Sequence, residues 1–251
     1  MEAPPFLNEA GEPRAFVIVS SARSGSNLLV SYLRQVQRAA CLGEIFRERF
    51  PEKPGWGNLV TRFDLPDTAR RLHAQDLTGF WELILSRGLA RRGWLGAKAF
   101  HYHRATDPLW DRFAAPDHRV LHLVRDSVFD QYVSRLLAVE SGAWKAGDHD
   151  AEPRVAFDRD DYLRFRARMA TGVERVRNRY GHTDRYVEIE YRQLNDHAFM
   201  AALLRQLFGE QVAVEERRTR QRGRPKLEYL RDPGAGAAFA GDSLSSGFAE
   251  V

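Results

Sequence analysis

The hydrophobic positions along this chain form two kinds of pattern that alternate from one end to the other. Short apolar runs rich in β-branched residues, the pattern of buried strands, cover 15–20, 94–100, 119–124 and 186–189. Apolar residues at helical spacing occupy 28–36, 67–91, 127–139, 159–180 and 197–208. Strands that alternate with helices predict a three-layer α/β sandwich with a mostly parallel central sheet.

The segments between these elements set the expected domain organisation. Proline- and glycine-rich residues at 50–66 and polar residues at 141–158 are typical of loops. No internal repeat and no break in composition marks a second domain. We therefore expect a mobile leader at 1–14, a single domain at 15–235 and a flexible, glycine-rich tail at 236–251.

Composition narrows the class of protein. The chain has 251 residues, of which 43% are hydrophobic and 29% charged, and this is ordinary for a soluble globular protein. A single cysteine, Cys41, excludes an intramolecular disulfide framework. No apolar run approaches the roughly 20 residues that span a bilayer, and the first residues do not have the pattern of a signal peptide. We therefore expect a cytoplasmic protein without a membrane span.

The charge balance suggests an anionic partner. The formal net charge is +4 and the pI is near 9.4. Only four of the 38 basic residues are lysine. Arginine is the better bidentate ligand for phosphate, although genomic base composition can also produce this bias. Composition alone does not identify the partner.

The first candidate site is the loop SSARSGSN between the first predicted strand and helix. The backbone N–H groups and the dipole at a helix N-terminus form an anion site. Gly25 permits a sharp turn and a close approach to a ligand, while Ser24, Ser26 and Asn27 can donate hydrogen bonds. Arg23 adds a fixed charge. The alternative is an ordinary strand-to-helix turn with a serine cap.

This loop differs from the Walker A sequence, because it lacks the Gly-Lys-Ser/Thr end whose hydroxyl holds magnesium. It resembles the donor-binding loop of sulfotransferases that use 3′-phosphoadenosine-5′-phosphosulfate (PAPS). The form RSGSNLL is most similar to the bacterial carbohydrate branch, which includes mycobacterial trehalose sulfotransferase and nodulation-type enzymes. The resemblance covers roughly residues 15–230 and implies a P-loop-like sulfotransferase fold, PAPS as donor and no metal.

A second motif follows the third predicted strand, where Arg125 and Ser134 lie nine residues apart. Sulfotransferases of this type place an arginine and a serine at about this spacing on the 3′-phosphate of the nucleotide. The resemblance therefore implies that Arg125 and Ser134 bind that phosphate. The alternative is a surface ion pair of Arg125 with Asp126 or Asp130.

Two later segments complete the resemblance. Tyr191 occupies a tyrosine position that lies near the adenine in relatives, although Arg192 departs from the usual glutamate there. The arginine-rich stretch TRQRGRPK resembles a loop that closes over the nucleotide. Its candidate contacts are Arg220, Arg222 and Arg224, with Lys226 a weaker one. The alternatives are a tyrosine packed at a strand end and a solvated basic run.

Sulfuryl transfer to a hydroxyl needs a general base, and Glu44 is the preferred candidate. The trehalose-sulfotransferase branch has a Gly-Glu pair at the corresponding place. The apolar neighbours Leu42, Ile45 and Phe46 suggest that desolvation raises the pKa of Glu44 and makes it a stronger base. The alternative is a surface ion pair with Arg47.

The second candidates for the base are His101 and His103, which follow a predicted strand. Histidine is the base in the eukaryotic cytosolic branch, and its pKa suits this task. The His-x-His pair has no third ligand at convincing spacing, so a metal site is disfavoured. Lys98 is expected to help shape the acceptor pocket.

The sequence therefore predicts a sulfotransferase that passes a sulfuryl group in line from PAPS to a hydroxyl of a carbohydrate or small metabolite. Arg23 would stabilise the leaving phosphate oxygen. Possible sugar-stacking residues are the tryptophans Trp56, Trp81, Trp94 and Trp144. The alternatives are a P-loop-like small-molecule kinase and a basic nucleic-acid-binding module. We expect no nucleic-acid partner, and the sequence leaves a homodimer open.

Overall fold

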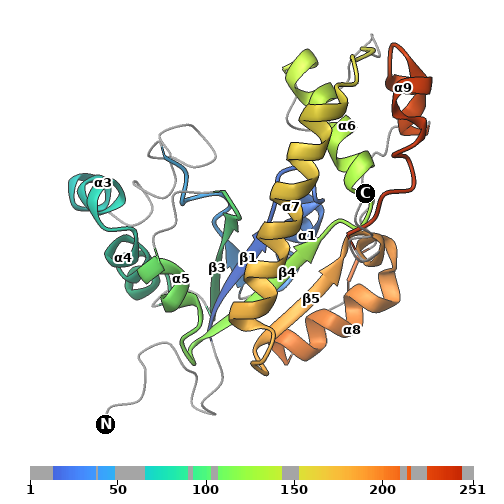
Figure 1. Cartoon of the computed structure of the whole chain (residues 1–251). Coiled ribbons are helices and arrows are strands. Elements are labelled where there is room, and N and C mark those ends of the chain that lie inside the picture. The colour runs from blue at the N-terminus through green and yellow to red at the C-terminus, as the bar shows by residue number, and fades with distance from the viewer. Residues whose placement is uncertain are drawn as a thin grey trace.

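A five-stranded sheet runs through the centre of the molecule (Figure 1). In spatial order its strands are β2 (Ala39–Cys41), β3 (Trp94–Phe100), β1 (Ala15–Ser20), β4 (His118–Val124) and β5 (Tyr186–Glu190). Every neighbouring pair is parallel, so the carboxyl ends of all strands meet at one edge. Ligand sites in open parallel sheets lie outside this edge, which makes it the place to look for the site.

The computed structural model describes residues 14–37, 39–48, 66–89, 93–102, 107–142, 153–209, 214–215 and 225–244. Its α-helices are α1 (Ser26–Leu33), α3 (Pro66–Gln75), α4 (Leu77–Leu89), α5 (Asp107–Phe113), α6 (Val128–Ser141), α7 (Arg159–Tyr180), α8 (His197–Phe208) and α9 (Pro233–Ala237). Two short 3₁₀ helices are η1 (Tyr191–Asn195) and η2 (Lys226–Tyr229). None of the helices in these ranges is long and apolar enough to cross a membrane.

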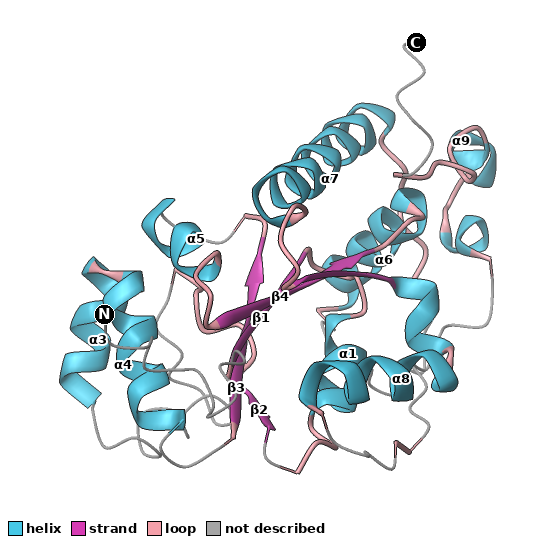
Figure 2. Ribbon diagram, turned by 90° about the horizontal axis from the view of Figure 1, so that it is seen from below, coloured by secondary structure: helices cyan, strands magenta, loops and turns pink. Residues whose placement is uncertain are grey.

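Helices cover both faces of the sheet, which confirms the predicted three-layer α/β fold (Figure 2). Alternate residues of a strand point to opposite faces, and β1 shows the division clearly. Val17 and Val19 pack in one core with residues of α4, α5 and α7, whereas Phe16 and Ile18 pack in a second core with α1 and α8. The sheet is therefore buried on both sides, as parallel sheets are.

A third core joins α6 and α7 to the C-terminal segment. The ring of Phe239 stacks on that of Phe157 with centroids 5.5 Å apart. The hydroxyl of Tyr162 donates to Asp242 over 2.7 Å, and Leu244 N–H donates to the Asp126 carbonyl over 3.1 Å. These contacts tie residues as far as 244 to the domain, within the stretch for which the sequence predicted a flexible tail.

Three local details differ from the predicted elements. The pattern at 67–91 predicted one helix, but Asp76 separates α3 from α4 and caps α4 by accepting the Gly79 N–H over 2.9 Å. Strand β2 and helix α5 were not predicted, since three and seven residues are too few to show a period. Trp81 and Trp94 lie in the two cores rather than on a sugar-binding surface.

Candidate active site

The loop between β1 and α1 has a backbone shaped for close contact with a ligand. Gly25 precedes α1 with φ at 93°, and Arg23 has φ at 65° although it is not glycine. A non-glycine residue in this left-handed region is uncommon and marks strained sites. A Cβ on Gly25 would lie 2.5 Å from the Tyr191 ring, so only glycine fits between this ring and the loop. The loop and Tyr191 thus form one cradle.

Residues far apart in the sequence meet at this loop. The Nε of Arg23 donates to the Ser134 hydroxyl over 3.0 Å, and the two residues are 111 positions apart. Arg125 donates to the Arg23 carbonyl over 3.0 Å, while its guanidinium lies 4.5 Å from the centre of the Tyr191 ring. Four of the residues that the resemblance placed on the donor therefore lie together in the structure.

The hydroxyl of Ser24 and the Nε of Arg125 are two polar groups of this site that are buried and have no partner among the described residues. Burial lowers the pKa of Arg125, against the opposing effect of Tyr191 and Asp130. A buried polar group without a partner is costly, so both groups are suited to the oxygens of a bound anion.

Sequence reasoning missed Gln131, which anchors the loop from α6. Its side-chain amide donates to the Ser21 hydroxyl and to the Ala22 carbonyl, each over 2.6 Å. Gln131 lies three residues before Ser134, so both side chains point from the same face of the helix toward the loop. This spacing is the signal from which Gln131 could have been identified.

A second cluster, the Lys98 cluster, joins the loop to Glu44. Lys98 is only 3% exposed, and its Nζ lies 2.8 Å from Asn27 Oδ1, 3.4 Å from the Ser26 hydroxyl and 3.1 Å from Glu44. Glu44 also pairs with Arg47. Lys98 was expected only to help shape the acceptor pocket. In the structure it connects the loop between β1 and α1 to Glu44, the predicted base.

The electrostatics of Glu44 differ from those expected from its apolar neighbours. Ile45 and Phe46 are buried in the core, but the Glu44 carboxylate faces Lys98 and Arg47. Burial favours the neutral acid, and the two cations outweigh this and lower the pKa of Glu44. The expected rise in its pKa is therefore wrong for this structure, because charged neighbours from β3 and from the same turn dominate.

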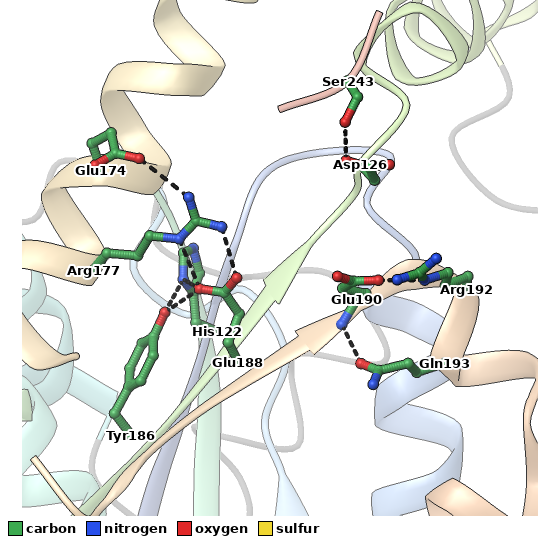
Figure 3. Close-up of polar contacts among 10 residues, drawn as sticks. All are labelled: His122, Asp126, Glu174, Arg177, Tyr186, Glu188, Glu190, Arg192, Gln193 and Ser243. Atoms are coloured by element: carbon green, nitrogen blue, oxygen red, sulfur yellow. Dashed lines mark hydrogen bonds and ion pairs between the residues drawn. The ribbon is translucent and has the colours of Figure 1, made fainter. Parts of the chain in front are cut away.

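His101 lies on the opposite face of β3 from Lys98, under α7. A Cβ on Gly172 of α7 would lie 2.5 Å from the His101 ring, and the ring of His122 is 5.5 Å away. His122 is hydrogen-bonded to Tyr186 over 2.7 Å, and Tyr186 and Arg177 both bind Glu188 (Figure 3). The structure therefore does not bring His101 to the Lys98 cluster.

This buried histidine pair predicts that acid weakens the fold. Burial, with His122 and Arg175 adding to it, lowers the pKa of His101 to about 3. Burial also lowers the pKa of His122, although Glu188 opposes the change. Since histidine in the unfolded chain takes up a proton below about pH 6.5, the unfolded state is stabilised as the pH falls. Urea unfolding should show a loss of about 2 kcal/mol from His101 alone between pH 7 and pH 5.

The variant His101→Gln should remove that part of the slope of unfolding free energy against pH. The matched control is His182→Gln, at an exposed position after α7, which should keep the slope of the parent protein. An unchanged slope in His101→Gln would contradict the assignment.

Several predicted site residues lie outside the described residues. They are His103, Arg220, Arg222, Arg224, Trp56 and Trp144. Lys226 is described, and its Nζ lies 5.2 Å from the centre of the Tyr229 ring rather than in the cradle. Within the described ranges, no group of three or more His, Cys, Asp or Glu residues is arranged to hold a metal ion.

The structure has a parallel α/β sheet with a loop that carries a cation, Arg23, between its first strand and a helix, and such a loop is suited to an anion. The chain belongs to the Sulfotransferase family, whose sequence model matches residues 14–208. This membership supports sulfuryl transfer over the kinase and nucleic-acid-binding alternatives. It does not distinguish branches of the family, so the carbohydrate branch stays a prediction.

The chain is similar to solved sulfotransferase structures. A sulfotransferase from Alicyclobacillus acidocaldarius superposes with a TM-score of 0.51 at 16% sequence identity, covering 91% of this chain and 92% of that chain. The sulfotransferase domain of the Synechococcus PCC 7002 olefin synthase gives a TM-score of 0.47 at 16% identity, covering 98% and 92%. No curated protein matches the chain. The first of these similarities supports the P-loop-like sulfotransferase fold.

Proposed function

We propose that the cradle binds PAPS and that the protein transfers its sulfuryl group to a hydroxyl of a carbohydrate or small metabolite. The observation that carries the proposal is the convergence of Arg23, Arg125 and Ser134 on one loop, beside the ring of Tyr191. PAPS carries a phosphosulfate and a separate 3′-phosphate, and it supplies an activated sulfuryl group. Two anionic groups need two sets of donors, and we assign the loop after β1 to one group and Arg125 with Ser134 to the other.

The residues present fit such a ligand. The loop N–H groups suit the 5′-phosphosulfate, as does the Ser24 hydroxyl, which has no partner among the described residues. Arg125, whose Nε has no partner among the described residues, suits the 3′-phosphate together with Ser134. Tyr191 offers a ring beside the adenine. One or more of Arg220, Arg222 and Arg224 would cover the nucleotide; these lie outside the described residues.

Three side chains would have separate roles in sulfuryl transfer. Glu44 would take the proton of the acceptor hydroxyl as its oxygen bonds to sulfur. Arg23 would stabilise the negative charge left on the phosphate oxygen as the sulfur–oxygen bond breaks. An anion bound beside Lys98 would weaken the pairing of Lys98 with Glu44, and this raises the pKa of Glu44 and makes it a stronger base. Donor binding would therefore prepare the base for the acceptor.

Thermal unfolding with two nucleotides tests the proposal. Adenosine 3′,5′-bisphosphate (PAP) carries the 3′-phosphate, and 5′-AMP lacks it. At 100 times its Kd, PAP should add about 2.7 kcal/mol to the free energy of unfolding and raise Tm by about 5–10 °C. The same concentration of 5′-AMP should give a clearly smaller shift, because Arg125 and Ser134 have no phosphate to bind. Equal shifts would contradict the proposal.

A further inference from the structure

The carboxyl end of β3 and the turn after it bring three side chains into a row beside Glu44. Lys98 and Phe100 alternate in β3 and so project to one side, and Tyr102 follows two residues after the strand ends. The Lys98 Nζ lies 5.5 Å from the centre of the Phe100 ring, and the Phe100 and Tyr102 rings are 5.4 Å apart. The row thus leads from the Lys98 cluster outward to Tyr102.

Tyr102 is unusual because it is a large ring left open to solvent. Its side chain is 59% exposed, and Val139 is the one other large hydrophobic residue exposed to this degree within the described ranges. The functional assignments above leave Tyr102 without a role. An exposed aromatic ring beside a polar site offers a flat apolar surface against which a ligand can pack.

The backbone places Tyr102 beside the start of the loop between β1 and α1, which we call the donor loop. Phe100 pairs with Ser20 in the sheet, and His101 N–H donates to the Ser20 carbonyl over 2.9 Å. The Tyr102 hydroxyl accepts a hydrogen bond from the N–H of Ala22. The exposed ring therefore stands beside the loop while its hydroxyl points inward.

The hydroxyl of Tyr102 also interacts electrostatically with Glu44, the predicted base. Burial of the hydroxyl end raises its pKa, and the Glu44 carboxylate adds to this effect. Arg47 and Arg135 act in the opposite direction. The Tyr102 hydroxyl is therefore bound to an N–H of the loop after β1 and is close enough to Glu44 to interact with its charge.

We infer that Tyr102 closes the acceptor side of the donor loop and forms a wall of the acceptor site. Without acceptor, its hydroxyl covers the Ala22 N–H and keeps water from the transfer position. With acceptor, its exposed ring packs against the apolar face of a six-membered ring that carries the hydroxyl, such as a pyranose. This inference rests on the proposed function and narrows its acceptor class.

The reaction that Tyr102 would suppress is hydrolysis of the donor. A water oxygen bonds to sulfur as the bond from sulfur to the phosphate oxygen breaks, and Glu44 takes the proton of the water. The products are PAP and sulfate. This reaction needs no acceptor, so it can be measured while the acceptor is unknown.

The experiment compares Tyr102→Ala, Tyr102→Trp and the control Val139→Ala. Release of labelled sulfate from PAPS without acceptor should rise about tenfold in Tyr102→Ala, as expected for the loss of one covering hydrogen bond of about 1.4 kcal/mol. Tyr102→Trp keeps a ring over the loop and should stay closer to the parent protein. Val139→Ala removes the other exposed hydrophobic residue, on α6, and should leave the rate unchanged.

A second arm tests the acceptor class. Methyl glucopyranoside should divert the sulfuryl group from water in the parent protein more strongly than glycerol at the same hydroxyl concentration. Tyr102→Ala should lose this difference. Equal effects of the ring and the linear polyol in the parent protein would overturn the assignment of a ring-bearing acceptor.

Calorimetric titration with PAP distinguishes a failure of the proposed function from a failure of the role assigned to Tyr102. PAP should bind all variants with a similar Kd, which also shows that they are folded. If PAP does not bind the parent protein, the proposed function fails. If PAP binds throughout but Tyr102→Ala hydrolyses PAPS at the parent rate, the proposed function stands and the role of Tyr102 is overturned.

Discussion

Replacing Glu44 with glutamine is expected to lower the rate of sulfuryl transfer by about 10²–10⁴-fold, the usual contribution of a positioned general base. Glutamine has nearly the same shape and can still contact Lys98, but it cannot take a proton. Formation of PAP from PAPS measures the rate, and titration with PAP measures donor binding. We expect the loss in kcat, with PAP binding changed little.

The pH profile distinguishes Glu44 from a histidine base. A base acts when deprotonated, and Lys98 and Arg47, overcoming the effect of burial, lower the pKa of Glu44. The value of kcat/KM for PAPS, which reports the protein before the donor binds, should therefore stay level down to about pH 5 and fall only near or below the ordinary carboxylate value of about 4.3. A histidine base of ordinary pKa would make the rate fall already below about pH 6.5.

Two matched variants complete this test. Glu48→Gln removes an exposed carboxylate four residues away and should leave the rate unchanged. His101→Gln should also retain transfer, since His101 lies under α7 on the other face of β3. If His101→Gln abolishes transfer while Glu44→Gln does not, Glu44 is not the base.

Replacing Arg125 with alanine is expected to remove the preference for PAP over 5′-AMP. A hydrogen bond to a charged group contributes about 1.5–3 kcal/mol, so PAP affinity should fall by about 10–150-fold. Affinity for 5′-AMP should change far less, because 5′-AMP has no 3′-phosphate for Arg125 to bind. Calorimetric titration with both nucleotides measures the ratio directly.

Controls separate this recognition from general electrostatics and from folding. Arg164→Ala removes an exposed positive charge on α7 and should leave the ratio of affinities unchanged. Arg125→Lys keeps the charge but lacks the planar fork that binds phosphate through two N–H groups, so it should recover only part of the affinity. A parent-like ratio in Arg125→Ala would assign the 3′-phosphate elsewhere.

The sequence was most informative where neighbours in the chain make the structure. The long helix at 159–180 has the predicted bounds, since its capping residue Asp158 and its periodicity are local. The loop after β1 could likewise be recognised, because strand, small residues and helix follow one another directly. Helix α5 and strand β2 could not, because such short elements form only by packing on the sheet.

For the site, sequence reasoning identified residue types and the tertiary structure set their environment. Arg23, Arg125, Ser134 and Tyr191 were candidates by motif, but only folding brings them into contact. Lys98 shows the limit most clearly, since nothing local indicates that it lies between Asn27 and Glu44, 54 positions from Glu44.

The sequence by itself therefore determined the α/β class of this protein, the loop of small residues after its first strand and the side chains available there, because these depend on residues adjacent in the chain. Only the tertiary structure decided which charges neighbour each other. It lowered the pKa of Glu44, turned His101 to the opposite face and placed Tyr102 at the donor loop. A pKa depends on burial and on charges within a few ångströms, and those distances exist only in the folded chain.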